Sequence, residues 1–200
     1  MIKLFGVPVL ETSVLLTETE KNDIIWYILK NEPFCSKPKA WTCDLSTSHN
    51  SDPALFDIGI FQPLAKSIHK YAIQYAKDIQ FSFDNHGLIM SSMWFNVYRE
   101  KQGQEKHDHG RSFISCTYIV DAPEGSSDFM CYNPLKEGLV GYPTSVDNNL
   151  LLKPFKSQTG KLIIFPGWLE HGVQLNNTKS PRISISCNWN IIDKKMDIWM

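Results

Sequence analysis

Polar and apolar side chains alternate over residues 182–191, near the end of the chain, and this pattern restricts the fold more than any other. Its polar residues are Arg182, Ser184, Ser186, Asn188 and Asn190, and its apolar residues are Ile183, Ile185, Cys187, Trp189 and Ile191. Successive side chains of a β-strand point to opposite faces, so one face of this strand is polar and the other is apolar. The simplest interpretation is an amphipathic strand whose polar face meets water.

A predicted helix offers a second interpretation. Its apolar residues recur at steps of three and four, and they are Phe61, Leu64, Ala65, Ile68, Ala72, Tyr75, Ala76 and Ile79. Such a helix must cover an apolar surface. If it covers the apolar face of strand 182–191, the polar face lines the interior of a barrel. Arg182 would then need an anion, and a dicarboxylate would meet that need.

The remaining segments predict helices first and strands afterwards. Thr17 and Glu20 have the capping-box spacing that begins a helix, and Pro33 ends it. The expected strands are 2–10, an edge, then 89–98, 113–120, 161–165 and 182–191. Residues 33–56 and 121–160 are expected to be loops, and a loop as long as the second is often functional. These patterns predict a mainly β protein with N-terminal helices packed on its outer face.

Composition limits the classes of function. A length of 200 residues with 42% hydrophobic content suits a single domain. Lys and Arg total 20 against 21 for Asp and Glu, which disfavours nucleic acid as a partner. Five cysteines without a Cys-x-x-Cys pair suit the reduced thiols of the cytosol. No apolar run is long enough to cross a bilayer. We therefore expect a soluble, cytoplasmic protein without a membrane partner.

Three histidines suggest a metal site. His107 and His109 at positions i and i+2 of an extended segment point to the same side, and His171 could arrive from a distant strand to complete a facial site with open positions. The spacing is a weak signal by itself, because His107 and His109 could be hydrated loop residues and His171 could belong to a turn. The ordered combination is stronger: His-x-His, a strand, a long loop, a second strand, His171, and Arg182 eleven residues later. The other histidines are interpreted as surface or satisfied core residues: His49, His69 and His86.

This combination resembles the Fe(II)- and 2-oxoglutarate-dependent oxygenases, and within them a 2OG-Fe(II) oxygenase family frequent in phages and marine bacteria. The residues that carry the resemblance are 94–97, 107–109, 115–118, 160–173 and 182–188. The resemblance implies a double-stranded β-helix, or jelly-roll, with the metal at its mouth. It also implies one oxygenase domain over residues 1–200, with residues 1–88 as a helical and loop part and residues 89–191 as the jelly-roll core.

The resemblance further implies roles for individual residues. The wider superfamily binds iron through two histidines and a carboxylate, whereas this chain has His109 at the carboxylate position. We favour His107, His109 and His171 as metal ligands, with Asp108 as the fallback, although Asp108 in a regular strand would point away from His107. The residues expected to bind or surround 2-oxoglutarate are Arg182, Ser184, Tyr118, Asn96 and Tyr98.

The implied activity is oxidation, by hydroxylation or a related reaction, of an unidentified small molecule or protein side chain. The cofactors would be Fe(II), 2-oxoglutarate and O2, with succinate and CO2 as products. Residues 33–56 and 121–160 would select the substrate, and a homodimer and a phage origin are both compatible with the resemblance. Two alternatives stay open. One is a cupin-like three-His dioxygenase that uses no 2-oxoglutarate, against which Arg182 argues, and the other is a non-catalytic jelly-roll binding module.

Overall fold

Two stacked β-sheets with two helices on one outer face make up the protein. The computed structural model describes residues 6–135 and 151–194. The larger sheet has the order β1-β8-β5-β10-β3-β2, and the smaller has the order β4-β9-β6-β7. The strands are β1 Leu10–Ser13, β2 Ser46–Thr47, β3 His86–Tyr98, β4 Gln104–His107, β5 Ile114–Asp121, β6 Phe129–Tyr132, β7 Leu152–Phe155, β8 Lys161–Pro166, β9 His171–Val173 and β10 Arg182–Asp193.

The helices begin and end largely where the sequence predicts. α1 Glu18–Asn31 has Thr17 as its N-cap, and the reciprocal bonds between Thr17 and Glu20 form the expected capping box. α2 Gln62–Asp78 is the predicted amphipathic helix. Three short 3-10 turns, Glu32–Phe34, Leu55–Asp57 and Gly59–Phe61, connect these segments. Of the helices in the described residues, none has the length and apolar content needed to span a membrane.

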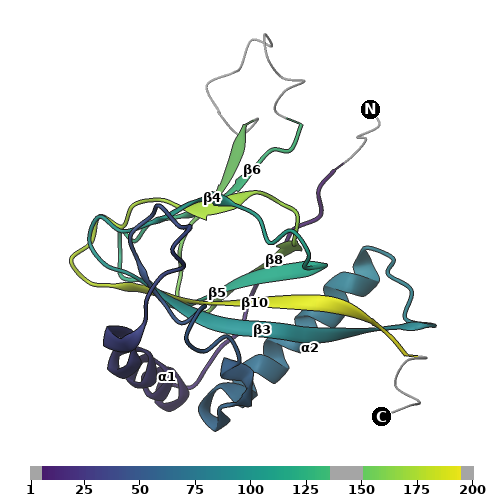
Figure 1. Ribbon diagram of the computed structural model, residues 1–200, viewed down its shortest axis with the longest axis horizontal. Coiled ribbons are helices and arrows are strands. Elements are labelled where there is room, and N and C mark those ends of the chain that lie inside the picture. The colour runs from purple at the N-terminus through teal and green to yellow at the C-terminus, as the bar shows by residue number, and fades with distance from the viewer. Residues whose placement is uncertain (1–5, 136–150, 195–200) are drawn as a thin grey trace.

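Both helices cover the outer face of the larger sheet (Figure 1). The main hydrophobic core lies between the helices and this sheet. It contains the apolar residues of β10, namely Ile183, Ile185, Cys187 and Trp189. Strand β10 lies between β3 and β5, antiparallel to both. Its opposite face therefore points toward the smaller sheet, and the interior position expected for Arg182 and Ser184 is confirmed, since both are buried.

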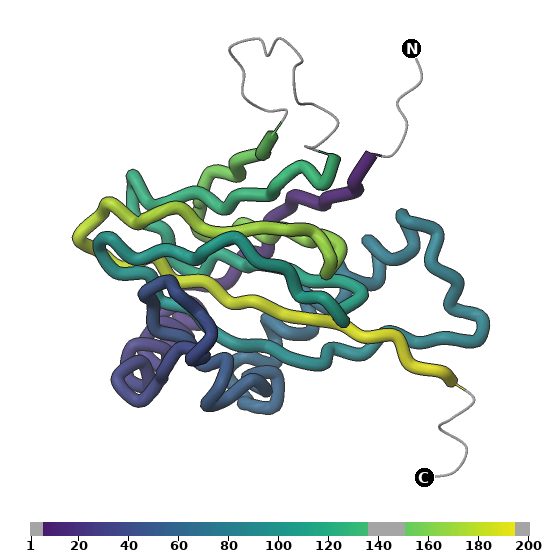
Figure 2. The backbone as a smooth tube through the Cα atoms, turned by 45° about the horizontal axis from the view of Figure 1, so that its top comes forward, coloured from purple at the N-terminus to yellow at the C-terminus, as the bar shows by residue number. Residues whose placement is uncertain are grey.

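The smaller sheet closes the other side of this interior (Figure 2). A second apolar cluster fills part of the space between the sheets and consists of Phe129, Cys131, Phe155, Ile163, Phe165 and Leu169. Strands β5 and β10 follow each other in space but not in sequence, as the crossing connections of a jelly-roll require. The predicted fold class, a double-stranded β-helix with helices on its outer face, is confirmed.

Two segments differ from the sequence prediction. The edge strand expected at 2–10 begins only at Leu10, where its backbone pairs with β8; residues 1–5 lie outside the described part. The segment expected as a loop from 121 to 160 contains the antiparallel pair β6 and β7. These strands are only four residues long each, too short for a periodic pattern to reveal. Residues 136–150 of this segment are not among those described.

Candidate metal centre and co-substrate pocket

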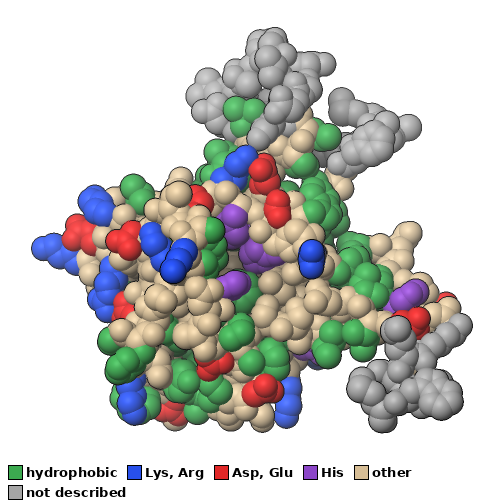
Figure 3. Space-filling model, in the orientation of Figure 1, with side chains coloured by type: hydrophobic (Ala, Val, Ile, Leu, Met, Phe, Trp, Pro, Cys, Tyr) green, Lys and Arg blue, Asp and Glu red, His purple; other side chains and the backbone are tan. Residues whose placement is uncertain are grey.

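The three histidines singled out from the sequence lie together in space. His107 ends β4 and faces His171, the first residue of β9, across an antiparallel pair. His109 follows two residues after His107, and one ring nitrogen from each of the three lies within 4.8 Å of the others. Histidine side chains gather near the middle of the face that Figure 3 shows. Strand pairing thus brings His171 beside two histidines that precede it by at least 62 positions in the sequence.

Each of these rings is oriented by a hydrogen bond at Nδ1. The Nδ1 of His107 lies 2.8 Å from the carbonyl oxygen of Glu105, and that of His171 lies 2.8 Å from the carbonyl oxygen of Leu169. A carbonyl oxygen can only accept, so Nδ1 carries the proton in both rings. The unprotonated Nε2 of each ring is then available to a metal, which is the usual arrangement of metal-binding histidines.

His109 differs because side chains orient its ring. Its Nδ1 lies 2.7 Å from Oδ1 of Asn188 and 2.9 Å from Oγ of Ser115. The Ser115 hydroxyl also donates to Oδ1 of Asn188, at 2.8 Å. Since Oδ1 only accepts, the arrangement places the proton of His109 on Nδ1 and leaves Nε2 unprotonated, as in the other two rings.

Burial keeps the three imidazoles neutral. Burial first, and then the nearby His107, lower the pKa of His109 to about 4. The same two causes, burial first and then the neighbouring histidines, bring the pKa of His171 well below its ordinary value. Burial also lowers the pKa of His107. Metals bind the neutral form of histidine, so the cluster is ready for a metal at neutral pH without losing protons.

Asp108 lies outside this cluster. Its side chain is exposed, and its Oδ1 accepts a hydrogen bond from the backbone N–H of Gly110 at 2.8 Å. This contact forms a local turn that directs the carboxylate to solvent. Asp108 is therefore not placed where it could join His107 and His171.

A buried arginine lies on the same side of the large sheet. Arg182 is completely buried, its Nε donates to Oγ of Ser157 at 2.9 Å, and its Nη1 donates to Oγ of Ser184 at 3.3 Å. Nη2 has no hydrogen-bond partner, and no carboxylate of the described residues forms an ion pair with this guanidinium. Burial lowers the pKa of Arg182, because a charge is costly away from water, while Tyr98 and Asp128 oppose the shift without forming an ion pair. The site is therefore suited to a carboxylate ligand.

Tyr98 lies between the arginine and the histidine cluster. The guanidinium of Arg182 lies 5.1 Å above the ring of Tyr98, and Tyr98 lines the cavity that contains the three histidines. Asn96 also lines it and has a buried Oδ1 without a partner, while its Nδ2 donates to Oγ of Ser186 at 3.2 Å. Unpaired polar atoms of this kind usually meet a ligand or water.

Residues 92–188 match the family model described as "Putative 2OG-Fe(II) oxygenase". Over this stretch, just under half of its length, the chain is similar to the 2OG-Fe(II) oxygenases. The matched residues cover the three histidines, Asn96 and Arg182. Enzymes of this family use Fe(II), 2-oxoglutarate and O2, and the neutral histidine cluster and the unpaired arginine both fit these cofactors. No curated protein matches this chain by sequence.

Solved structures show the same fold at low identity. A prolyl-4-hydroxylase from Pseudomonas putida has a TM-score of 0.63 at 8% identity, with 92% of each chain covered. The epimerase SnoN, in complex with Fe3+, alpha-ketoglutarate and nogalamycin RO, has a TM-score of 0.64 at 13% identity, with 94% of this chain and 81% of SnoN covered. HygX from Streptomyces hygroscopicus, with nickel and 2-oxoglutarate bound, has a TM-score of 0.61 at 10% identity, with 92% and 83% covered.

One residue expected at the co-substrate pocket of the oxygenase lies elsewhere, and that prediction is wrong. Tyr118 belongs to the core under the helices, and its hydroxyl donates to the carbonyl oxygen of Val14 at 3.0 Å. Its neighbour Thr117 lines the cavity instead. Side chains of a strand alternate, so a residue one position from an inward residue must point outward.

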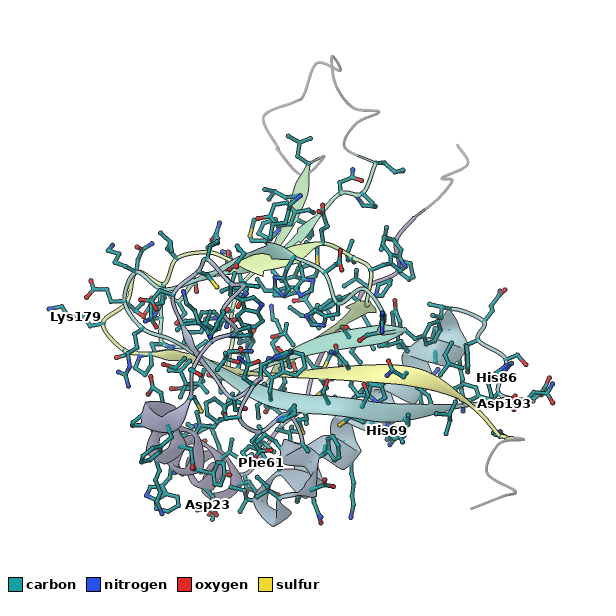
Figure 4. All side chains as sticks on the ribbon, viewed as in Figure 1. Asp23, Phe61, His69, His86, Lys179 and Asp193 are labelled. Atoms are coloured by element: carbon teal, nitrogen blue, oxygen red, sulfur yellow. The ribbon has the colours of Figure 1, made fainter. Side chains whose placement is uncertain are left out.

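The other three histidines lie in different surroundings. His69 on α2 accepts a hydrogen bond from Nε1 of Trp189, and His86 lies beside Asp193 at the far end of the β3–β10 pair (Figure 4). His49, however, has a buried Nδ1 without a partner, and its ring lies 4.9 Å from that of Trp94, a cavity residue. The Nδ1 of His49 therefore lacks the partner that a fully satisfied core histidine would have.

Proposed function

We propose that this oxygenase hydroxylates a C–H bond of its substrate, and that His107, His109 and His171 bind its iron through Nε2. The overall reaction consumes one O2, one 2-oxoglutarate and one substrate, and it yields hydroxylated substrate, succinate and CO2. Iron and 2-oxoglutarate, when bound, supply the activation of O2. The chain binds and orients these groups, while Phe129 and Phe165, packed 5.4 and 4.6 Å from the ring of His171, exclude water from one side.

The observation that carries this proposal is the fully buried guanidinium of Arg182, whose Nη2 has no partner and which packs on Tyr98, a residue that lines the cavity of the histidines. In the proposal it binds the distal carboxylate of 2-oxoglutarate, with Ser184 on one side and the ring of Tyr98 beneath it. Asn96 lines the same cavity. A cupin-like three-His dioxygenase, which binds its substrate directly on the metal, would give this charge no partner.

The N-terminal part of the chain and the segment 121–160 select the substrate in this proposal. Trp41, from the segment 33–56, lines the cavity and supports this role. Similar folds act on different compounds: one bears the name prolyl-4-hydroxylase, and another functions in nogalamycin biosynthesis. The substrate must therefore be inferred from the cavity itself. We further propose that residues 1–200 form one oxygenase domain.

Two measurements test the proposed function. Calorimetry should show that metal-loaded protein binds 2-oxoglutarate, and succinate should form when Fe(II), ascorbate and 2-oxoglutarate are supplied. Arg182→Met should abolish 2-oxoglutarate binding while the exposed control Arg111→Met retains it. Metal binding without 2-oxoglutarate binding would favour the cupin-like alternative. Purified protein without metal, together with unchanged ligand binding in His107→Ala, would favour a non-catalytic binding module.

A further inference from the structure

Three aromatic side chains close one side of the histidine cluster. The ring of Trp41 lies 6.2 Å from His107 and 5.6 Å from His49, measured between ring centroids. The ring of Trp94 lies 4.9 Å from His49 and 5.6 Å from His109. With the 5.4 Å contact between His107 and His109, the five rings form a closed circle. We call Trp41, His49 and Trp94 the aromatic wall.

The aromatic wall is fixed by hydrogen bonds. The carboxylate of Glu105 accepts from the backbone N–H groups of Thr42 and Cys43 at 2.9 and 3.2 Å, which holds Trp41 against strand β4. Pairing of β2 with β3 and the bond from Oγ1 of Thr47 to the carbonyl oxygen of Phe95 hold the turn that carries His49. The wall is therefore a preformed surface, and Trp41 and His49 lie outside the residues matched by the family model.

The side chains around the cavity bear no formal charge. Its lining contains aromatic, hydroxyl and amide groups, including Gln104 and Thr117, and no Asp, Glu, Lys or Arg. When bound, Fe(II) and the 2-oxoglutarate dianion would cancel each other's charge. A charged group on a substrate would then lose its water here without gaining a counter-ion from these walls, so the lining favours an uncharged group.

His49 supplies one unused polar atom in the wall. Its Nδ1 is buried and has no hydrogen-bond partner. A buried nitrogen without a partner is costly, and His49 packs against Trp41 and Trp94, which line the cavity. A small shift of these rings on binding would let Nδ1 exchange a hydrogen bond with a bound hydroxyl or amide. The indole faces on both sides suit saturated carbon.

We propose that the aromatic wall is the substrate subsite, and that it binds an uncharged group which presents saturated carbon to Trp41 and Trp94 and hydrogen-bonds to Nδ1 of His49. This inference rests on the proposed function, because the bound carbon must lie beside the metal to be hydroxylated. It names the chemical class of the substrate: neutral alcohols or amides on an aliphatic frame.

The test uses three probes of the same shape: cyclohexanemethanol, cyclohexanecarboxylate and protonated cyclohexanemethylamine. The protein is loaded with Zn(II), which is redox-inert, and saturated with 2-oxoglutarate. Saturation-transfer NMR titrations give the dissociation constant of each probe. The alcohol should bind at least about tenfold more tightly than either charged probe. Trp41→Ala should weaken alcohol binding about tenfold.

His49→Phe keeps an aromatic ring in the wall but removes Nδ1, so it should weaken alcohol binding about fivefold. The matched controls Trp26→Ala and His86→Phe, at exposed positions remote from the cavity, should leave it unchanged, and circular dichroism verifies the fold of each variant. Equal or tighter binding of a charged probe, no binding of the alcohol, or unchanged alcohol binding in Trp41→Ala would overturn the inference. If 2-oxoglutarate still binds in those cases, the proposed function survives and only the inference about the aromatic wall fails. If 2-oxoglutarate does not bind at all, the proposed function and the inference both fail.

Discussion

Asn188 should control the metal affinity of the histidine cluster without touching the metal. Backbone carbonyls orient His107 and His171 and cannot be removed by substitution, whereas Oδ1 of Asn188, 2.7 Å from Nδ1, orients His109. Loss of such a partner typically costs 10- to 100-fold in metal affinity. The metal affinity of Asn188→Leu should fall about tenfold, near the lower end of this range. The reason is that Oγ of Ser115, at 2.9 Å from Nδ1 of His109, remains as an acceptor.

Removing both partners should show the larger effect. The metal affinity of the double variant Ser115→Ala/Asn188→Leu should fall about 100-fold, which corresponds to roughly 2.8 kcal/mol of binding free energy. Asn188→Asp keeps an acceptor at the same place and should retain or raise the affinity. The assay is a Co(II) titration followed by the visible absorption bands, which report both affinity and coordination geometry. Asn190→Leu, exposed on the same strand, is the control. A double variant that binds Co(II) within about threefold of the unmodified protein would refute this reasoning.

Three further predictions concern stability and packing. Arg182→Met should raise the melting temperature of the cofactor-free protein, because it removes an unpaired buried charge; a clear decrease would contradict this explanation. In metal-free protein, stability should fall as pH drops from the ordinary histidine value of 6.5 toward 4, because the unfolded chain binds protons there that buried His109 does not. Calorimetric melting across this range should show that the melting temperature of His109→Gln depends less steeply on pH. An equal dependence in both proteins would argue against a lowered pKa of His109. Gly167→Ala should destabilise the protein and weaken metal binding, since a Cβ at Gly167 would lie 2.0 Å from the carbonyl oxygen of Ser112; unchanged melting would contradict the close approach.

The fold was predictable where a segment has one polar and one apolar face. The alternation of strand β10 and the apolar stripe of α2 each indicate which side must be covered, and together they predict helices outside the sheet and Arg182 inside. Strand β5 offers no such contrast, because nearly all of its residues are buried on both faces. The sequence could not show that Thr117 rather than Tyr118 points to the cavity, so Tyr118 was misplaced.

The candidate site was predictable in part, for a similar reason. Proximity of His107 and His109 follows from their spacing, whereas the place of His49 follows from an irregular segment fixed by tertiary hydrogen bonds. Asn188 was on the polar face of its strand in the sequence. Its contact with His109, 79 positions away, depends on how far the loop after β4 reaches across the sheet, which no local pattern specifies.

The central claim is that His109 occupies the ligand position where related enzymes have a carboxylate. Calorimetric titration of Fe(II), without oxygen, into His109→Ala and Asp108→Ala tests it most directly. Asp108→Ala should keep the iron affinity of the unmodified protein, and the iron affinity of His109→Ala should fall at least about 100-fold. Loss of iron binding in Asp108→Ala with full affinity in His109→Ala would contradict the three-histidine site.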